Sequence, residues 1–234
     1  MQRAGLAAAA LFAAALASRP GPALAHIPAP ETVARAAADT SRGQGRVRAF
    51  TFAVSVRTSA EAAPIARGEL LADPRGSVRI ELQHEGGFAE RQIRQPGGLA
   101  ASRDGEPLDA PHPLAPPFWL LQAATGGELL ARLGELGGDP SQIALGYDGA
   151  RDCYVLGGAV ASLWIDKDSY RVARVDLADG TKLRFLAFTT SSGAVFPSRI
   201  EIETPALTFQ LELTNAAPAT PAADAFADAW LLAH

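Results

Sequence analysis

Apolar and polar residues alternate with a period of two over most of the chain from residue 50 onward. Residues two apart point to the same face of a strand, so each alternating stretch predicts a strand with one buried face and one wet face. Glycine-containing turns such as Asp104-Gly105 and Asp179-Gly180 separate neighbouring stretches, which favours antiparallel hairpins. The expected strands cover residues 50–56, 65–72, 78–83, 88–95, 99–103, 152–156, 161–166, 170–177, 181–188, 195–204 and 206–214.

Two regions depart from this alternation. Residues 30–38 predict a helix that has Pro30 in its first turn and stops at the glycines of 43–45. A second region begins with a stiff connection that carries five prolines between residues 107 and 117. Helical spacing of apolar residues follows it, which predicts an insertion of two short helices at about residues 115–137.

The predicted fold class is mainly β, of the α+β type. About ten antiparallel strands in one sheet cannot stay flat, so we expect the sheet to curl into a half-open barrel. The N-terminal helix and the helical insertion have leucines and alanines to bury, and the concave face of the sheet is where they can do so. No linker or internal repeat divides the chain, so residues 26–234 are expected to form a single domain.

The first 25 residues have the pattern of a secretory signal. Arg3 is followed by an uncharged run rich in Ala and Leu, and an A-x-A cleavage site ends at Ala25. The run is shorter than the roughly 20 residues that a membrane-spanning helix needs. Cleavage after Ala25 would leave His26 first, which offers no cysteine for a lipid anchor. The pattern therefore predicts export to the periplasm as an unanchored protein.

Composition excludes several classes of function. Lys and Arg total 21 against 25 Asp and Glu, and a net charge of −4 does not favour binding to nucleic acid. The single cysteine, Cys153, rules out an internal disulfide and is expected to be buried. The 48% hydrophobic content is typical of a globular protein with a core.

Residues that could carry chemistry are scattered. The four histidines lie far apart in the sequence, so we predict no metal site, and we find no G-x-S-x-G signature of a serine hydrolase. Asp166 and Asp168 fit turn residues better than a calcium loop. Glu90, Arg91 and Arg94 fit a solvated strand edge, with a lipid head group as the alternative. We expect no catalytic residues and no cofactor, and hence a protein that is not an enzyme.

The order and spacing of these segments resemble the periplasmic outer-membrane lipoprotein-sorting proteins, the LolA-like family. The resemblance covers roughly residues 31–214 and depends on several short segments in sequence rather than on one motif. In order they are 50–52 (FTF), 68–71 (GELL), Pro74, 78–80 (VRI), 102–105 (SRDG), 154–156 (YVL), 163–166 (LWID), 170–175 (YRVARV) and 196–200 (FPSRI).

This resemblance implies a carrier in which helices cover the cavity of a half-open barrel that receives acyl chains. Its expected partners are an acylated lipoprotein or lipid, together with membrane donor and acceptor proteins, and we expect the protein to be monomeric. The candidate lid residues are Phe118, Trp119 and Leu120. The candidate cavity lining is Phe50, Phe52, Val54, Ile80, Leu82, Leu163, Ile165, Leu183, Phe185, Ile200, Ile202, Phe209 and Leu211.

Two departures from the family pattern keep an alternative open. The carriers have a basic residue just before the proline that precedes the third strand, whereas this chain has Asp73 there. Their aromatic-Pro-Pro-Gly ending has no clear match in residues 222–230. The alternative is a sensor or adaptor with the same fold that binds a protein partner in envelope regulation. An apolar patch on the outer face of the sheet would favour it.

Overall fold

The computed structural model describes residues 27–43, 45, 48–149 and 151–233. The predicted signal segment and its cleavage site lie outside the described residues. Within the described part, no helix is both long and apolar enough to cross a membrane.

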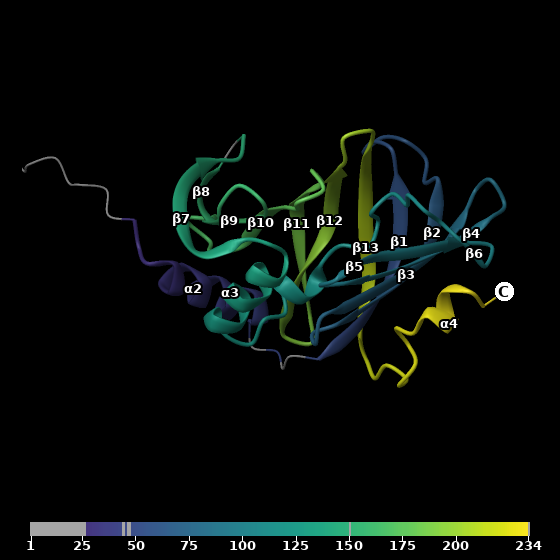
Figure 1. The fold of residues 1–234 in the computed structure, drawn as a ribbon, viewed down its shortest axis with the longest axis horizontal. Coiled ribbons are helices and arrows are strands. Elements are labelled where there is room, and N and C mark those ends of the chain that lie inside the picture. Colours follow the sequence, from purple (N-terminus) through teal and green to yellow (C-terminus); the bar gives the residue numbers. More distant parts are fainter. Residues whose placement is uncertain (1–26, 44, 46–47, 150, 234) are drawn as a thin grey trace, which may run out of the picture.

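The described strands form a single antiparallel sheet of 13 strands in the order β6-β5-β4-β3-β2-β1-β13-β12-β11-β10-β9-β8-β7 (Figure 1). The first half of the chain extends the sheet in one direction from β1, and the second half extends it in the other direction from β13. The strands are β1 (Ala49–Arg57), β2 (Ala66–Asp73), β3 (Ser77–His84), β4 (Ala89–Gln95), β5 (Gly98–Arg103), β6 (Glu106–Pro107), β7 (Asp139–Tyr147), β8 (Asp152–Gly157), β9 (Ser162–Asp166), β10 (Val172–Asp176), β11 (Lys182–Ser191), β12 (Ala194–Glu203) and β13 (Thr208–Ala219).

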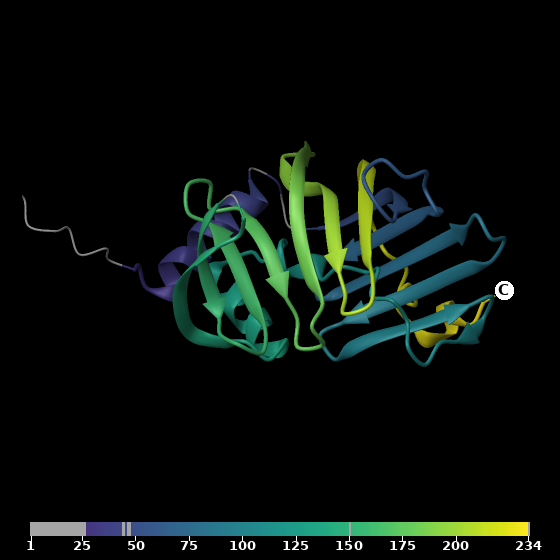
Figure 2. The ribbon, with the colours of Figure 1, turned by 90° about the horizontal axis from the view of Figure 1, so that it is seen from above.

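The sheet curls strongly but does not close, since β6 and β7 do not pair with each other in the described structure. Figure 2 shows the β7–β9 end bent around the helices. Register shifts between Thr51 and Ala53 and between Phe185 and Phe188 interrupt the pairing of central strands. Such bulges increase local twist, which accounts for the curl. The predicted half-open antiparallel architecture is confirmed.

Helices cover both faces of the sheet. Helix α2 (Pro30–Arg42), the 3-10 turn η1 (Phe118–Leu120) and helix α3 (Gly126–Glu135) pack on the concave face, while the short α4 (Asp228–Leu231) lies near β4 (Figure 1). Neighbouring residues of β2 show the two faces. Leu70 belongs to the large concave core, and Leu71 packs with Ala49 and Ala225 on the other side.

The sequence missed several elements. The predicted helix at 118–121 is one 3-10 turn, and β7, β6, α4 and the second half of β13 were not expected. In β7 almost every side chain is exposed, so alternation between apolar and polar positions gives no signal there. The N-terminal helix ends at Arg42 before Gly43, whose φ of 55° suits glycine, so the predicted stop at the glycines is confirmed.

Cys153 is fully buried in β8, as predicted. Burial and the nearby carboxylates of Asp148 and Asp166 raise the pKa of its thiol, so little thiolate is present at neutral pH. We expect this cysteine to react with a thiol reagent such as DTNB only when the protein is unfolded. Labelling in native buffer against labelling in denaturant measures this, and rapid labelling of the native protein would contradict the described packing.

Candidate functional site

The concave face of the sheet carries the largest apolar cluster of the described structure. All 13 residues predicted to line a cavity belong to this one cluster, and each is at most 6% exposed. They come from both halves of the sheet, from Ile80 on β3 to Ile165 on β9. The structure therefore brings the predicted lining together as an apolar surface facing the helices.

The lid segment, residues 118–136, is inserted into this surface. Phe118, Trp119 and Leu120 are at most 2% exposed, and Phe118 packs against Phe52 with ring centroids 5.3 Å apart. Phe196 in turn packs edge-on against Phe52. The indole Nε1 of Trp119 is buried without a hydrogen-bond partner among the described residues. In this state the lid segment occupies the concave face.

One arginine of the lid segment fastens it to the sheet. The guanidinium of Arg132, on α3, donates to the backbone carbonyl oxygen of Trp119 and pairs with Glu128. It also donates to the carbonyl oxygen of Pro74, in the turn between β2 and β3, at 2.6 Å. Its side chain is 10% exposed. Arg132 thus joins the start of the lid segment to α3 through Trp119, and joins α3 to the sheet through Pro74.

Polar residues of β4 fix the proline-rich connection that leads into the lid segment. The Gln92 side chain donates to the carbonyl oxygen of His112 at 2.7 Å and accepts from the backbone N–H groups of Leu114 and Ala115. Arg94 Nε donates to the carbonyl oxygen of Ala115 at 2.6 Å. These contacts hold the start of the lid segment in place, so opening would have to occur beyond residue 115.

The prediction of a solvated edge for β4 is therefore wrong for two of its three residues. Glu90 and Arg94 are 5% and 7% exposed: Arg94 bonds to Ala115 of the proline-rich connection, and Glu90 accepts from Gln92 and lies 3.6 Å from His84. Arg91 is the partly exposed one, and it pairs with Glu81 at 2.8 Å. The alternation of residues in β4 cannot indicate that a segment about 20 residues further along the chain covers its polar side chains.

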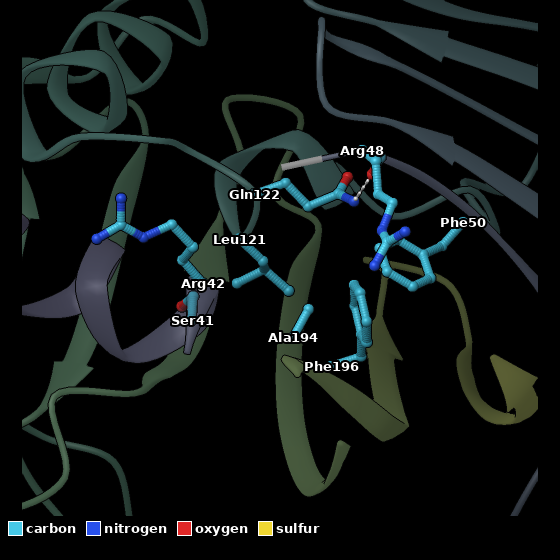
Figure 3. A pocket seen from close by; sticks show the side chains of 8 residues that line it. All are labelled: Ser41, Arg42, Arg48, Phe50, Leu121, Gln122, Ala194 and Phe196. Atoms are coloured by element: carbon cyan, nitrogen blue, oxygen red, sulfur yellow. Dashed lines mark hydrogen bonds between the residues drawn. The ribbon is translucent and has the colours of Figure 1, made fainter. Parts of the chain in front are cut away.

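A small gap remains where the lid segment leaves the sheet (Figure 3). Its volume is about 20 Å³, enough for about one water molecule and far too little for an acyl chain. A wider pocket of about 410 Å³ lies next to it and shares Arg48 as a lining residue. The gap is lined by Ser41, Arg42, Arg48, Phe50, Leu121, Gln122, Ala194 and Phe196.

Asp73, which stands where the carriers have a basic residue, binds Arg75 instead of the lid segment. Arg75 Nη2 lies 2.7 Å from Asp73 Oδ2, and the backbone N–H of Arg75 donates to Oδ1 at 2.9 Å. Burial acts to raise the pKa of the Asp73 carboxyl, but the Arg75 hydrogen bonds and charge lower the pKa below its ordinary 3.8. The contact between the sheet and the lid segment here is made instead by Arg132 of the lid segment, which reaches the carbonyl oxygen of Pro74.

The lowered pKa of Asp73 makes a testable contribution to acid stability. A depressed folded-state pKa adds stability that is complete above the unfolded pKa and is lost as pH falls through the folded pKa. We expect Asp73→Asn to lower the free energy of unfolding at pH 7 by about 1 kcal/mol and to weaken its decline below pH 4. Urea unfolding from pH 7 to pH 2 measures both, and an unchanged acid profile would contradict this role.

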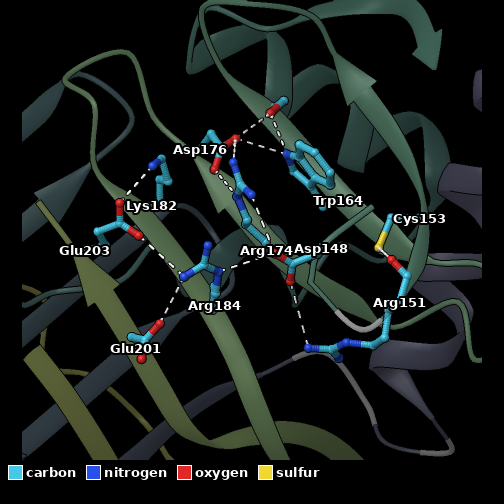
Figure 4. A network of polar contacts seen from close by, with 11 residues as sticks. Asp148, Arg151, Cys153, Trp164, Arg174, Asp176, Lys182, Arg184, Glu201 and Glu203 are labelled. Atoms are coloured by element: carbon cyan, nitrogen blue, oxygen red, sulfur yellow. Dashed lines mark hydrogen bonds and ion pairs between the residues drawn. The ribbon is translucent and has the colours of Figure 1, made fainter. Parts of the chain in front are cut away.

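The outer face of β10 to β12 is charged (Figure 4). The buried Asp148 carboxylate accepts from Arg184 at 3.3 Å and lies 3.5 Å from Arg174. Arg174 also pairs with Asp176 and lies over the ring of Trp164. Because cations and acids alternate, this part of the outer face offers no apolar docking patch. The remaining members of the network are Arg151, Lys182, Glu201 and Glu203.

Comparison with solved structures identifies the architecture. A LolA superfamily protein from Nitrosomonas europaea superposes with a TM-score of 0.53 at 15% identity, over 88% of this chain and 100% of that one. The chain has the LolA-like fold. A domain from Vibrio parahaemolyticus named for outer membrane lipoprotein sorting superposes with a TM-score of 0.50 at 10% identity, over 86% and 97% of the two chains.

The LolA-like fold confirms the architecture that the sequence resemblance implied. No protein-family model matches the chain. No curated protein matches it either. At this level of identity the likeness concerns the fold, so the function has to be argued from the concave face and the lid segment. In the described residues, no group of three or more His, Cys, Asp or Glu side chains is arranged to hold a metal ion.

Proposed function

We propose that this protein binds acyl chains of lipids or lipoproteins under its lid segment and carries them across the periplasm to the outer membrane. The observation that supports this most is the continuous apolar concave face, which the lid segment fills together with helix α2. Apart from this apolar packing, Arg132 joins the lid segment to the sheet through the backbone carbonyl oxygen of Pro74, a hydrogen bond that can break when the lid segment moves away. Export rests on the signal pattern of residues 1–25.

The energetics of transfer require partner proteins. Moving an acyl chain from water into the core yields about 0.8 kcal/mol for each CH₂ group. Moving the same chain out of a bilayer yields almost nothing, because both environments are apolar. A carrier therefore needs a donor that does work to load it and an acceptor that binds the lipid at least as well. We propose a binding role without catalysis for the chain itself.

Native mass spectrometry of the protein purified from the periplasm in detergent-free buffer tests this function. We expect a co-purifying phospholipid or acylated peptide, or uptake of one when it is added to the empty protein. Its mass would also identify the class of cargo. A protein that carries no lipid and takes up none after incubation with acylated peptides and phospholipids would refute the carrier role.

A sensor or adaptor that binds a protein partner is the second candidate, and the edge strand β7 favours it. Residues Leu145 and Tyr147 are 48% and 65% exposed, and the outer edge of β7 pairs with no strand in the described structure. Uncharged edge strands offer free backbone groups to a partner strand. If Leu145→Lys abolished the cellular function while acyl binding remained normal, the adaptor role would replace the carrier role.

A further inference from the structure

Arg48 lines both the small gap and the wider pocket, and no acidic side chain of the described residues pairs with it. Its guanidinium lies over the Phe50 ring, 5.7 Å from the centroid, and no ion pair joins it to a described residue. The residues outside the described part contain no Asp or Glu. By contrast, Arg75 and Arg132, which line the same pocket, pair with Asp73 and Glu128.

The surroundings of Arg48 change from apolar to charged over a short distance. On one side the gap has walls of Phe50, Leu121 and Phe196, and it leads toward the concave core (Figure 3). On the other side the wider pocket carries three arginines against two acids, a net side-chain charge of +1. An apolar gap beside a cation that has no described acidic partner matches a molecule with a tail and an anionic head, once the lid segment moves to widen the gap.

A second polar side chain at the gap, Gln122, is only partly hydrogen-bonded within the described structure. Gln122 is 7% exposed, and its Nε2 donates to the carbonyl oxygen of Arg48 at 3.1 Å. Its Oε1 is buried and accepts no hydrogen bond from the described residues. A buried acceptor left without a donor is costly, and a ligand hydroxyl at the gap would satisfy it.

We propose that this gap and pocket form the head-group site for an acyl lipid that carries a phosphate or carboxylate. The tail enters between Phe50 and Leu121, and the anionic group binds the Arg48 guanidinium through charge-assisted hydrogen bonds. This inference rests on the proposed function, since the tail would lie in the same core. It adds the charge of the cargo and the place where the cargo enters.

A head group bound in this pocket would also act on the contacts of the lid segment. Arg132 and Glu128 line the pocket that holds Arg48, and Arg132 carries the contacts to Trp119 and Pro74. An anion in this pocket competes with Glu128 and the two carbonyl oxygens for the Arg132 guanidinium. Binding of the head group thus weakens the contacts that keep the lid segment on the sheet.

The test compares single-chain lipids that share one acyl chain. Lysophosphatidylglycerol and monoacylglycerol are titrated against a fluorescent fatty-acid probe bound to the wild-type protein, Arg48→Gln, Arg48→Lys and Arg199→Gln. Arg199 is exposed on β12 and has no ion pair with a described residue, so it controls for loss of one positive charge. Inorganic phosphate, titrated in the same way without any lipid, is the last ligand in the comparison.

We expect the wild-type protein and Arg199→Gln to prefer the anionic lipid by about tenfold or more over the neutral one. Arg48→Gln should lose this preference while binding monoacylglycerol as before, and Arg48→Lys should keep much of it. Equal affinity of the wild-type protein for both lipids would overturn the head-group site but leave the carrier role intact. Binding of inorganic phosphate as tight as that of the anionic lipid would overturn a lipid site in favour of a phosphate site. Failure of every lipid to bind would overturn both proposals.

Discussion

Replacing Arg132 with leucine is expected to release the lid segment and to speed acyl uptake by tenfold or more. The substitution leaves the carbonyl oxygens of Trp119 and Pro74 without their donor, in a place where the arginine side chain is 10% exposed. A buried acceptor that loses its donor costs about 1–3 kcal/mol, which applies in full to Trp119 and in part to the half-buried Pro74. The cost falls on the closed state, so the population with the lid segment off the sheet should rise.

Stopped-flow mixing with a fluorescent fatty acid measures the uptake rate, and urea unfolding measures stability. Glu128→Gln is the matched control, because its amide oxygen can still accept from the Ala124 backbone N–H while Arg132 keeps both carbonyl contacts. We expect this control to leave the uptake rate within about twofold of the wild type. A destabilised Arg132→Leu that takes up the probe no faster would show that the lid segment does not limit entry.

The sequence predicted the concave face well because alternation carries that information locally. Strands β12 and β13 pair without a register shift, and their alternate residues Ile200, Ile202, Phe209 and Leu211 all face the core. A period of two in the sequence is therefore sufficient to predict which side chains are buried there. Leu207 shows the limit of the rule. It continues the same alternation but lies in the turn before β13 and is 50% exposed.

The contacts that hold the lid segment were beyond the sequence because they join residues far apart. Arg132 looks like an ordinary polar-face residue of a helix until Pro74, 58 positions away, approaches it. Gln92 and Arg94 stand at polar positions of β4, which predicts exposure. The proline-rich connection covers them in the folded protein, and the sequence of β4 contains no sign of this. Arg48 gave no signal either, since its lack of an acidic partner is a property of the folded surroundings.

Trp119→Ala is expected to have the largest effect on stability, a loss of about 3–5 kcal/mol in the free energy of unfolding. Trp119 is fully buried, and its ring fills the space between the lid segment and the concave face. The cavity left behind would be apolar and would lie within the concave core that the acyl chain is proposed to enter. We therefore expect acyl uptake by the folded variant to rise more than its stability loss alone accounts for.

Two further variants separate a gate from ordinary core packing. Phe185→Ala removes an aromatic ring of the same cluster from β11, away from the lid segment, and should cost similar stability without faster uptake. Trp119→Phe removes the indole N–H that lacks a described partner, so its cost should be well below that of alanine. Uptake is measured in the folded fraction by stopped flow, with stability taken from urea unfolding. If Trp119→Ala and Phe185→Ala changed uptake equally, Trp119 would be an ordinary core residue and not part of a gate.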